Sequence, residues 1–452
     1  MRLHLISIGG SAMHNLAIAL KNNGNIVTGS DDEIFEPSKS RLKKYGLLPE
    51  KIGWNTEKIT PDIDIVILGM HARKDNPELL KAINLGLKIV SYPEFLYYQS
   101  VNKIRVVIAG SHGKTTITAM VMHVLNFYNR NFDFIVGSKL KDFEVMVRLS
   151  NDAPIMVFEG DEYLSSPIDL RSKFLWYKPH IALISGIAWD HINVFPSFEN
   201  YLDQFFEFAD SILPDGKLIY NDDDKYLKKI VIQMNNNIET IPYSIPNYEI
   251  IDGVTYLVTN KNRYPLQIFG EHNLTNLNGA RKICNSLGIN DEDFYRAITS
   301  FQGADNRLTL VFKKGRGRLF KDFAHAPSKV KATLKAVKQQ FPEQKIVVGF
   351  ELHTFSSLNA SFLKQYTGSL DMADAAFVYF NPHALELKRL PSISTETVKI
   401  AFNKNNLMVF NDSNAAVDWL KKEVTSETVL LMMSSGNFNG LKFEKLAGEL
   451  FK

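Results

Sequence analysis

The segment KIRVVIAGSHGKTT at 103–116 constrains the possible folds of this chain more than any other part of the sequence. The apolar run at 104–108 predicts a buried strand of a parallel sheet, and Gly110 and Gly113 follow it directly. Glycines at such a turn allow several backbone N–H groups to point toward one phosphate group. The sequence therefore predicts a phosphate-binding turn between a strand and a helix.

Two residues that follow this turn extend the interpretation to a nucleoside triphosphate. Lys114 would reach the terminal phosphates as a positive charge, and the hydroxyl of Thr115 would coordinate Mg²⁺. The spacing Gly-x-x-Gly-Lys-Thr is shorter than the usual Gly-x-x-x-x-Gly-Lys-Thr. From this segment alone, an ordinary strand-to-helix turn with an exposed lysine therefore stays an alternative.

Length and charge narrow the class of protein. A chain of 452 residues exceeds what one hydrophobic core usually supports, so we expect two or three domains. A formal net charge of only +3 disfavours nucleic acid as a partner. No apolar run approaches the ~20 residues that span a bilayer, and the single cysteine, Cys284, fits a reducing compartment. We expect a cytoplasmic enzyme that acts on small molecules, in an oligomeric state that the sequence leaves open.

The first hundred residues follow the order of a doubly wound nucleotide-binding domain. A predicted strand at 3–8 ends in glycines, a helical pattern follows, and a second strand at 25–28 stops just before an acidic residue. Such a domain places phosphates at a helix N-terminus and a ribose near a carboxylate. A nicotinamide site is disfavoured, because Ser11 and His14 replace two glycines of Gly-x-Gly-x-x-Gly. The residues predicted to bind a nucleotide here are Gly9, Gly10, Ser11, Ser30 and Asp31.

Acidic and histidine side chains follow two further predicted strands. Glu159, Asp161 and Glu162 crowd the end of a buried strand, where they would repel one another unless a cation or a cationic substrate lies among them. An acidic loop without a ligand is the alternative. A later strand ends in Asp190-His191, and open α/β sheets bind ligands at this edge. His191 is therefore a candidate ligand, with a purely structural role equally open.

The rest of the chain adds a helix, a hinge and a third α/β unit. Residues 270–283 predict a helix in which Asn273 and Asn276 could read a purine edge or could cap the helix. Residues 301–308 predict an interdomain hinge with Arg307 near its end. Strands and helices then alternate again to the end of the chain, which predicts another parallel sheet.

Taken together, these segments resemble the motifs of the Mur ligase family, the ATP-dependent amide-bond-forming enzymes of peptidoglycan assembly. The resemblance follows the same order as in the family and covers essentially the whole chain. The motifs are Gly110-Ser-His-Gly-Lys-Thr-Thr116, Glu159-Gly-Asp-Glu-Tyr163, Asp190-His191, Gly270-Glu-His-Asn273, Arg307 and Asp322-Phe-Ala-His-Ala-Pro327.

The resemblance implies a three-domain α/β fold and a place for each substrate. A Rossmann-like domain at 1–102 would bind the UDP of a UDP-N-acetylmuramoyl substrate, and a P-loop domain at 103–304 would bind ATP. A Rossmann-like domain at 305–452 would bind the incoming amino compound.

The resemblance also assigns roles to individual residues. Lys114, Glu159 and His191 would be catalytic, and Thr115, Glu159 and His191 would hold Mg²⁺. The residues implied to bind ATP are Gly110, Ser111, His112, Gly113, Lys114, Thr115, Thr116, Asn273, Asn276, Arg307 and Asp322. Those implied to bind the UDP-sugar or the acceptor are Gly9, Gly10, Ser11, Ser30, Asp31, His71, Arg73, Asn76, Glu162, His325 and His353.

The implied reaction is transfer of the ATP γ-phosphoryl group to the muramoyl carboxylate, followed by attack of an amine on the acyl phosphate. One branch of the family adds L-alanine, and another rejoins the recycled tripeptide L-Ala-γ-D-Glu-meso-diaminopimelate. Arg171-Ser-Lys-Phe174 and the segment 433–440 are more similar to the recycling branch, so the tripeptide is the predicted acceptor and L-alanine the alternative. Phe206 stands where several other members carry a carbamylated lysine, as in these two branches.

Some positions depart from the family pattern. Two functions of other classes stay open: a P-loop ATPase that needs no acceptor and, suggested by the substitutions at Gly186 and Ala326, an inactive protein that binds UDP-muramate. The departures are Ser7, Ala12, Gly186, Ala188, Asn306, Ala326 and Glu351-Leu352-His353.

Overall fold

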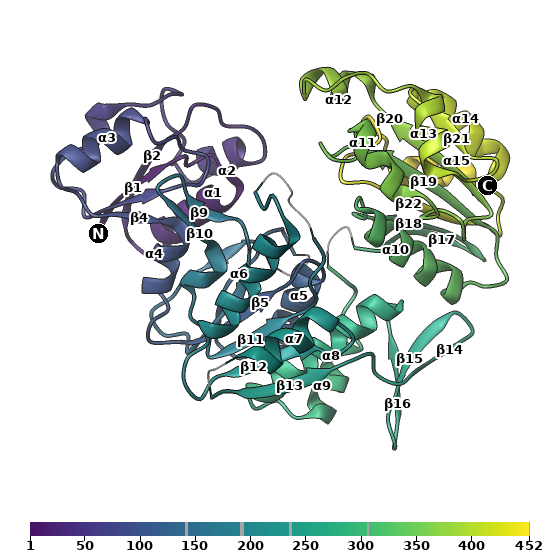
Figure 1. The fold of residues 1–452 in the computed structure, drawn as a ribbon, viewed down its shortest axis with the longest axis horizontal. Helices are drawn as coiled ribbons and strands as arrows, with labels where there is room; N and C mark the ends of the chain where they lie inside the picture. Colours follow the sequence, from purple (N-terminus) through teal and green to yellow (C-terminus); the bar gives the residue numbers. More distant parts are fainter. Residues whose placement is uncertain (141–142, 190–193, 235–236, 305–306, 452) are drawn as a thin grey trace. The chain divides into compact units, whose positions relative to one another are not determined.

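The computed structural model describes residues 1–140, 143–189, 194–234, 237–304 and 307–451 (Figure 1). The chain divides into two compact units, Met1–Ser244 with Thr275–Ile298, and Ile245–Leu274 with Thr299–Lys452. The first unit contains two α/β sheets, and the second contains a third. The predicted α/β architecture of three parts is confirmed.

The sheet at the start of the chain has four parallel strands in the order β2-β1-β3-β4. The second strand was expected at 25–28, and this end is wrong by two residues, because Gly29 and Ser30 still pair with Leu5 and Ile6. The elements are β1 (Arg2–Ile6), α1 (Ser11–Asn22), β2 (Ile26–Ser30), α2 (Ser38–Lys44), η1 (Thr56–Lys58), β3 (Ile65–Leu68), α3 (Pro77–Asn84), β4 (Ile89–Ser91) and α4 (Tyr92–Tyr98).

The central sheet has seven strands in the order β13-β12-β11-β5-β8-β6-β7, and within it only the β6–β7 pair is antiparallel among the described strands. Because β5 lies between β11 and β8, the segments that follow these three strands meet at one edge of the sheet. The strands are β5 (Ile104–Ala109), β6 (Asp133–Ile135), β7 (Val147–Arg148), β8 (Ile155–Glu159), β11 (Ile181–Ile184), β12 (Lys217–Asn221) and β13 (Glu239–Tyr243).

Helices and a hairpin accompany the central sheet (Figure 1). The hairpin of β9 (Leu164–Ser166) and β10 (Asp169–Ser172) leads into the short helix η2 (Lys173–Trp176). The helices are α5 (Lys114–Phe127), α6 (Phe198–Asp210), α7 (Lys225–Gln233), α8 (Glu271–Ser286) and α9 (Asp291–Ile298).

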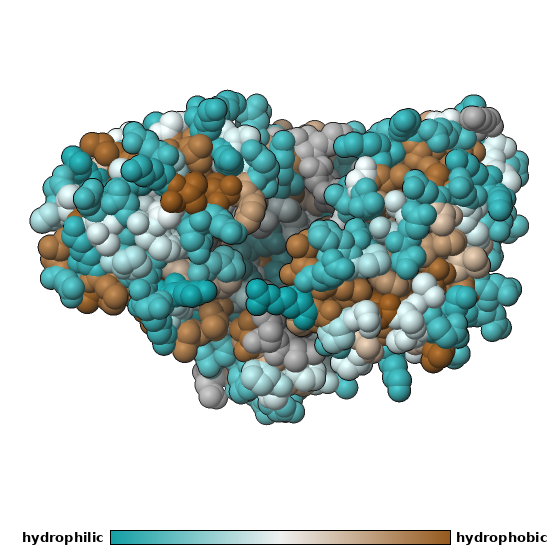
Figure 2. Space-filling view, turned by 90° about the horizontal axis from the view of Figure 1, so that it is seen from above, coloured by the Kyte–Doolittle hydropathy of each residue, from teal (hydrophilic) through white to brown (hydrophobic). Residues whose placement is uncertain are grey.

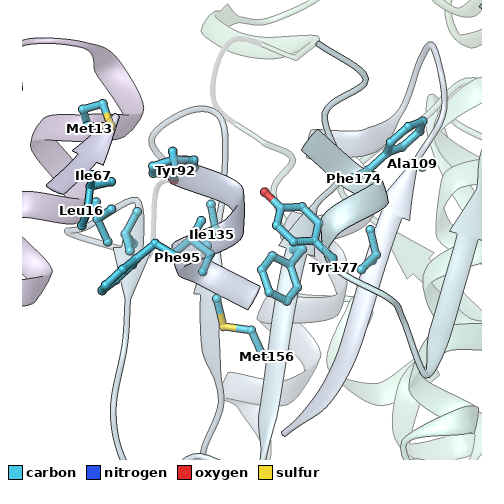
Figure 3. Close-up of a cluster of buried hydrophobic side chains, with 14 of the residues drawn as sticks. Met13, Leu16, Ile67, Tyr92, Phe95, Ala109, Ile135, Met156, Phe174 and Tyr177 are labelled. Atoms are coloured by element: carbon cyan, nitrogen blue, oxygen red, sulfur yellow. The ribbon is translucent and has the colours of Figure 1, made fainter. Parts of the chain in front are cut away.

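One hydrophobic core joins the first and the central sheet (Figure 3). Leu16 of α1 and Ile67 of β3 belong to the same cluster of buried side chains as Phe95 of α4, Met156 of β8 and Phe174 of η2. Each of these side chains is almost completely removed from water, which stabilises the fold by roughly 2 kcal/mol per large apolar side chain. The two sheets are therefore packed together as one body.

The second unit combines a small antiparallel sheet with a larger mixed sheet. The small sheet is β14 (Tyr248–Ile251), β15 (Val254–Val258) and β16 (Arg263–Leu266), and Thr255 donates a hydrogen bond of 2.8 Å to Gln340 of α10 (Pro327–Gln340). The larger sheet has the order β17-β18-β22-β19-β20-β21, with β17 antiparallel to β18 and the other pairs parallel. Its strands are β17 (Thr309–Lys314), β18 (Gly317–Asp322), β19 (Ile346–Leu352), β20 (Ala375–Phe380), β21 (Met408–Phe410) and β22 (Val429–Met433).

The remaining helices cover the larger sheet of this unit, and two apolar clusters fill its two faces. They are α11 (Ala360–Leu363), η3 (Lys364–Tyr366), α12 (Pro382–Leu387), α13 (Thr395–Phe402), α14 (Ser413–Glu423) and α15 (Phe443–Leu450). On the surface, Figure 2 shows hydrophilic residues spread widely, with hydrophobic residues in small groups between them. Among the described residues, no helix has the length and apolar character that crossing a bilayer requires.

Candidate nucleotide-binding and ligase site

The turn between β5 and α5 has the backbone that the sequence predicts. Gly110 has φ 124° and Gly113 has φ 80°, a conformation that residues with a side chain rarely adopt. A β-carbon at Gly110 would overlap the hydroxyl of Ser185, and one at Gly113 would overlap the side-chain oxygen of Asn276. Glycine is therefore required at both positions for conformation and for space.

The side chains of Lys114 and Thr115 reach the acidic edge of the sheet. Lys114 Nζ donates to Glu162 Oε2 at 2.8 Å and to the carbonyl oxygen of Gly110 at 2.6 Å. Thr115 Oγ1 donates to Glu159 Oε1 at 2.6 Å. The structure thus brings together four of the residues that the sequence singled out, although Lys114 is 48 positions from Glu162 and Thr115 is 44 positions from Glu159 in the chain.

Neighbouring charges favour the ionised forms of Lys114 and Asp161. Burial alone would lower the pKa of Lys114, but Glu162, Asp161 and Glu159 outweigh it and raise the pKa above its ordinary value. Burial would raise the pKa of Asp161, but Lys173, whose Nζ lies 2.6 Å from Asp161 Oδ2, brings it below its ordinary value. The lysine is therefore a fixed positive charge beside the phosphate-binding turn.

The donor set fits Mg²⁺. The ion prefers oxygen ligands and is usually held by one or two carboxylates together with substrate phosphates. The Thr115 hydroxyl and the Glu159 carboxylate supply such oxygens, and the backbone N–H of Gly137 orients Glu159 by donating to Oε2 at 2.9 Å. Among the residues that the structure describes, no three His, Cys, Asp or Glu side chains come close enough to hold a metal by themselves. The predicted ligand His191, its neighbour Asp190 and the substituted Asn306 lie outside the described residues.

A buried hydroxyl pair, which the sequence analysis did not foresee, lies behind the turn. Ser111 Oγ is 2.8 Å from Tyr201 OH, and the backbone N–H of Ala188 donates to Ser111 Oγ at 2.8 Å. Tyr201 OH also donates to Glu162 Oε1 at 3.2 Å. In the sequence, Tyr201 looks like one of several apolar positions on the inner face of α6, so only tertiary packing identifies it.

The two asparagines that are predicted to contact adenine belong to different units. Asn276 lies against Gly113 in the first unit. Asn273 belongs to the second unit, where its amide donates to the carbonyl oxygen of Phe269 at 2.9 Å. Of the other turn residues, His112 Nδ1 contacts the carbonyl oxygen of Ser111 at 2.7 Å, and Thr116 is buried in α5. The adenine contacts of both asparagines stay predictions.

The predicted nucleotide residues of the first sheet lie together after β1 and β2. The backbone N–H of Gly9 donates to Asp31 Oδ2 at 2.7 Å, and Gly10 precedes Ser11 at the start of α1. Burial raises the pKa of Asp31 to about 6, with Asp32 adding to the effect, while the Gly9 hydrogen bond opposes it. The Asp31 carboxylate therefore organises this turn through the Gly9 N–H, and its contact with a nucleotide stays a prediction.

Two further features of this turn concern Ser7 and Ser30. Ser7, which departs from the family glycine, has φ 69°, so a residue with a side chain occupies a conformation that favours glycine. Ser30 is buried, and its hydroxyl accepts a hydrogen bond of 3.3 Å from Lys58 Nζ. Lys58 is thus a neighbour of the predicted site that the sequence analysis missed.

After β3, three predicted substrate residues have different surroundings. His71 and Arg73 are exposed, whereas Asn76 is buried and caps α3. Its side-chain oxygen accepts hydrogen bonds of 3.0 Å from the backbone N–H groups of Glu78 and Leu79. The expected helix start at Asn76-Pro77 is confirmed, and the amide oxygen of Asn76 has a structural task.

In the second unit, Asp322 is tied to local backbone. Its Oδ2 accepts from the N–H of Leu308 at 2.6 Å, and its Oδ1 accepts from the N–H of Ala324 at 2.8 Å and from Thr333 Oγ1 at 3.1 Å. Arg307 directly precedes Leu308, and its guanidinium carbon lies 4.9 Å from the ring centre of Phe323. The carboxylate therefore fixes the path of the predicted hinge.

The two predicted acceptor histidines follow strands of the larger sheet. His325 Nδ1 lies 2.9 Å from the carbonyl oxygen of Phe323. His353 follows β19, with Nδ1 3.9 Å from Glu351 Oε1, and its side chain is 40% exposed. Glu351 is buried and accepts hydrogen bonds from Ser434 and from the N–H of Phe438. His353 therefore borders the segment 434–438, which the sequence alone did not place beside it.

A phosphate-binding turn inside a parallel sheet, with a lysine, a hydroxyl and carboxylates around it, defines a nucleotide-dependent enzyme of the α/β class. Three family models match the chain: "Mur ligase family, catalytic domain" at 2–99, "Mur ligase middle domain" at 108–284 and "Mur ligase, glutamate ligase domain" at 306–436. The chain belongs to the Mur ligase family, whose members are ATP-dependent ligases that form amide bonds between small molecules in peptidoglycan synthesis.

Individual relatives are similar over almost the whole chain. The UDP-N-acetylmuramate–L-alanine ligase of Caldicellulosiruptor bescii is 30% identical, with 96% of each chain covered. The structure of the UDP-N-acetylmuramate-alanine ligase MurC of Thermotoga maritima has a TM-score of 0.69 at 21% identity, with 100% of this chain and 98% of that chain covered. A murein peptide ligase of Psychrobacter arcticus has a TM-score of 0.63 at 23% identity, with 100% and 99% covered.

These comparisons confirm the class predicted from the sequence, an ATP-dependent carbon–nitrogen ligase, at the level of the family. They do not confirm the predicted preference for the peptide-recycling branch. The curated relative is named for L-alanine, and the solved structures represent both branches.

Proposed function

We propose that this chain joins the carboxylate of UDP-N-acetylmuramate to the amine of L-alanine at the expense of ATP. The observation that carries the choice of acceptor is the 30% identity, over 96% of both chains, to a relative named for this reaction. The geometry of the turn supports the ATP part of the proposal, because Lys114, Thr115, Glu159 and Glu162 meet at one place.

The chemistry requires activation of the carboxylate. A free carboxylate does not react with an amine at neutral pH, since oxide would have to leave. Transfer of the γ-phosphoryl group to this carboxylate gives an acyl phosphate, the amine attacks its carbonyl carbon, and phosphate leaves as the amide forms. Enzymes promote phosphoryl transfer mainly by positioning and by neutralising charge, and not by a covalent nucleophile.

In this proposal, each residue of the turn has a defined task. The backbone N–H groups between Gly110 and Thr115 receive phosphate oxygens, and Lys114 supplies a positive charge beside them. Thr115 and Glu159 hold Mg²⁺, with His191 as a further predicted ligand. When bound, the ion neutralises phosphate charge.

The remaining predicted residues complete the proposal. The turn at Gly9, Gly10, Ser11, Ser30 and Asp31, with His71, Arg73 and Asn76, would bind the UDP-sugar. Asn273, Asn276, Arg307 and Asp322 would contact ATP, and Glu162, His325 and His353 would serve the substrates. The domain limits at 102 and 304 and the cytoplasmic location stay predictions.

The recycled tripeptide is the second candidate acceptor, and the Arg171-Ser-Lys-Phe174 segment favours it. The structure gives both cations of this segment partners within the chain. Arg171 Nε lies 2.9 Å from Asp169 Oδ1, and Lys173 pairs with Asp161. These contacts explain the segment without a peptide ligand, which is a further reason to propose L-alanine.

Phosphate release from ATP tests the proposal, with UDP-N-acetylmuramate present and either L-alanine or the tripeptide as acceptor. We expect release that depends on both UDP-N-acetylmuramate and L-alanine. Release with the tripeptide alone would overturn the choice of acceptor. Release without any acceptor would identify an ATPase, and binding of UDP-N-acetylmuramate without release under any condition would identify an inactive binding protein.

A further inference from the structure

The buried hydroxyls of Ser111 and Tyr201 form a chain that ends at the lysine of the phosphate-binding turn. Tyr201 OH has one proton, which it donates to Glu162 Oε1 at 3.2 Å. The hydrogen bond of 2.8 Å between Ser111 and Tyr201 must then be donated by Ser111. Ser111 Oγ itself accepts from the N–H of Ala188 at 2.8 Å. Every donor in this chain therefore points toward the Glu162 carboxylate.

Burial gives this chain its strength. Tyr201 is 0% exposed, Glu162 is 1% exposed, and Ser111 is 6% exposed. Hydrogen bonds to an ionised group are stronger than neutral ones, and the surrounding low dielectric strengthens them further. With Tyr201 on one oxygen and Lys114 on the other, both oxygens of Glu162 are held. The carboxylate cannot turn without breaking a buried contact.

We propose that Tyr201, supported by Ser111, is a positioning residue for nucleotide binding: it fixes the Glu162 carboxylate, which in turn holds the Lys114 ammonium at the mouth of the phosphate-binding turn. Tyr201 lies in α6, which follows β11, and Glu162 lies in the segment after β8, so the contact joins segments that follow the two strands on either side of β5. Without the tyrosine hydroxyl, Glu162 loses one buried hydrogen bond, and the carboxylate holds Lys114 less rigidly. This inference rests on the proposed ATP site.

The test is binding of a non-hydrolysable ATP analogue in the presence of Mg²⁺, measured by titration calorimetry without turnover. We expect Tyr201→Phe to raise the Kd about 10-fold, the size of effect typical for one hydrogen bond to a buried charged group. Ser111→Ala should raise it in the same direction. The matched control is Tyr243→Phe, since Tyr243 is also buried and its hydroxyl has no hydrogen-bond partner among the described residues.

A double-mutant cycle separates positioning from general destabilisation. In a Glu162→Gln background, Tyr201→Phe should lose most of its effect on the Kd, because the carboxylate it would position is gone. An unchanged Kd for Tyr201→Phe, or an effect that persists fully in the Glu162→Gln background, would overturn the inference. If Tyr201→Phe does not fold, Ser111→Ala decides by the same two measurements. Failure of the unsubstituted chain to bind the analogue would instead refute the proposed function.

Discussion

Replacing Gly113 with alanine should damage the phosphate-binding turn in two separable ways. The first is conformational: at φ 80°, a β-carbon costs about 1 to 2 kcal/mol. The second is spatial, because the new β-carbon would overlap the side-chain oxygen of Asn276, and forced repacking costs about 1 to 3 kcal/mol more. Gly113→Ala should therefore lose roughly 2 to 5 kcal/mol of unfolding free energy.

The chain offers a matched control in Gly288, which has φ 83° and nothing within 4 Å of the position of a β-carbon. Gly288→Ala carries the conformational cost alone. The difference between the two variants in denaturant unfolding thus measures the overlap with Asn276. Adding Asn276→Gly to Gly113→Ala should recover that difference and leave the conformational cost in place.

Nucleotide affinity gives a second assay of the same change. Gly113→Ala should weaken binding of an ATP analogue because it displaces backbone N–H groups, whereas Gly288→Ala should leave binding unchanged. Equal destabilisation by the two alanines, together with normal analogue binding by Gly113→Ala, would refute the assignment of this turn.

Three further changes probe individual groups. Lys114→Ala should reduce phosphate release about 100-fold or more, because a positive charge beside the phosphates is lost. Lys228→Ala removes an exposed lysine of α7 and should leave phosphate release unchanged. Equal activity of the two variants would contradict the phosphate role of Lys114. Thr115→Val should raise the Mg²⁺ concentration needed for half-maximal phosphate release about 10-fold or more. The control is Thr118→Val in the same helix, which removes a hydroxyl that has no partner among the described residues and should leave this concentration unchanged. The pKa of Asp31 rises from 3.8 to about 6 on folding, so between these values the folded chain keeps a proton that the unfolded chain has lost. The free energy of unfolding should therefore fall by up to about 3 kcal/mol as the pH rises from about 4 to 6. Urea unfolding at several pH values measures this dependence, and Asp31→Asn should abolish it.

The sequence was sufficient for features that depend on neighbouring residues. The strand, the two glycines and the lysine of the turn are contiguous, so their arrangement follows from backbone geometry. Glu159 was also predictable, because it ends a buried strand and parallel strands place their ends at one edge. The extra residues of β2 were not, since only pairing with β1 extends a strand through Gly29.

Features that depend on tertiary contacts escaped the sequence analysis. Tyr201 resembles a core residue until α6 packs and turns its hydroxyl toward Glu162. Asp322 was predicted to bind ATP, but no local pattern indicated that its Oδ2 accepts from the backbone of Leu308 in the hinge and its Oδ1 from the backbone of Ala324. Gly110 needs space for Ser185, which lies 75 positions later in the chain.

The apolar cluster that joins Leu16 and Ile67 to Met156 and Phe174 makes the first two sheets a single cooperative block. A fragment that ends at residue 102 would leave Phe95 and its neighbours without their packing partners, so residues 1–102 should not fold as an isolated domain. The spacing between the turns at Gly9 and Gly110 is consequently set by the packed side chains of this cluster, and not by the length of the segment that connects the two sheets. Under the proposed function, a change in substrate preference would have to arise from exchanged loop residues, because a shift of one sheet against the other would disrupt their shared hydrophobic core.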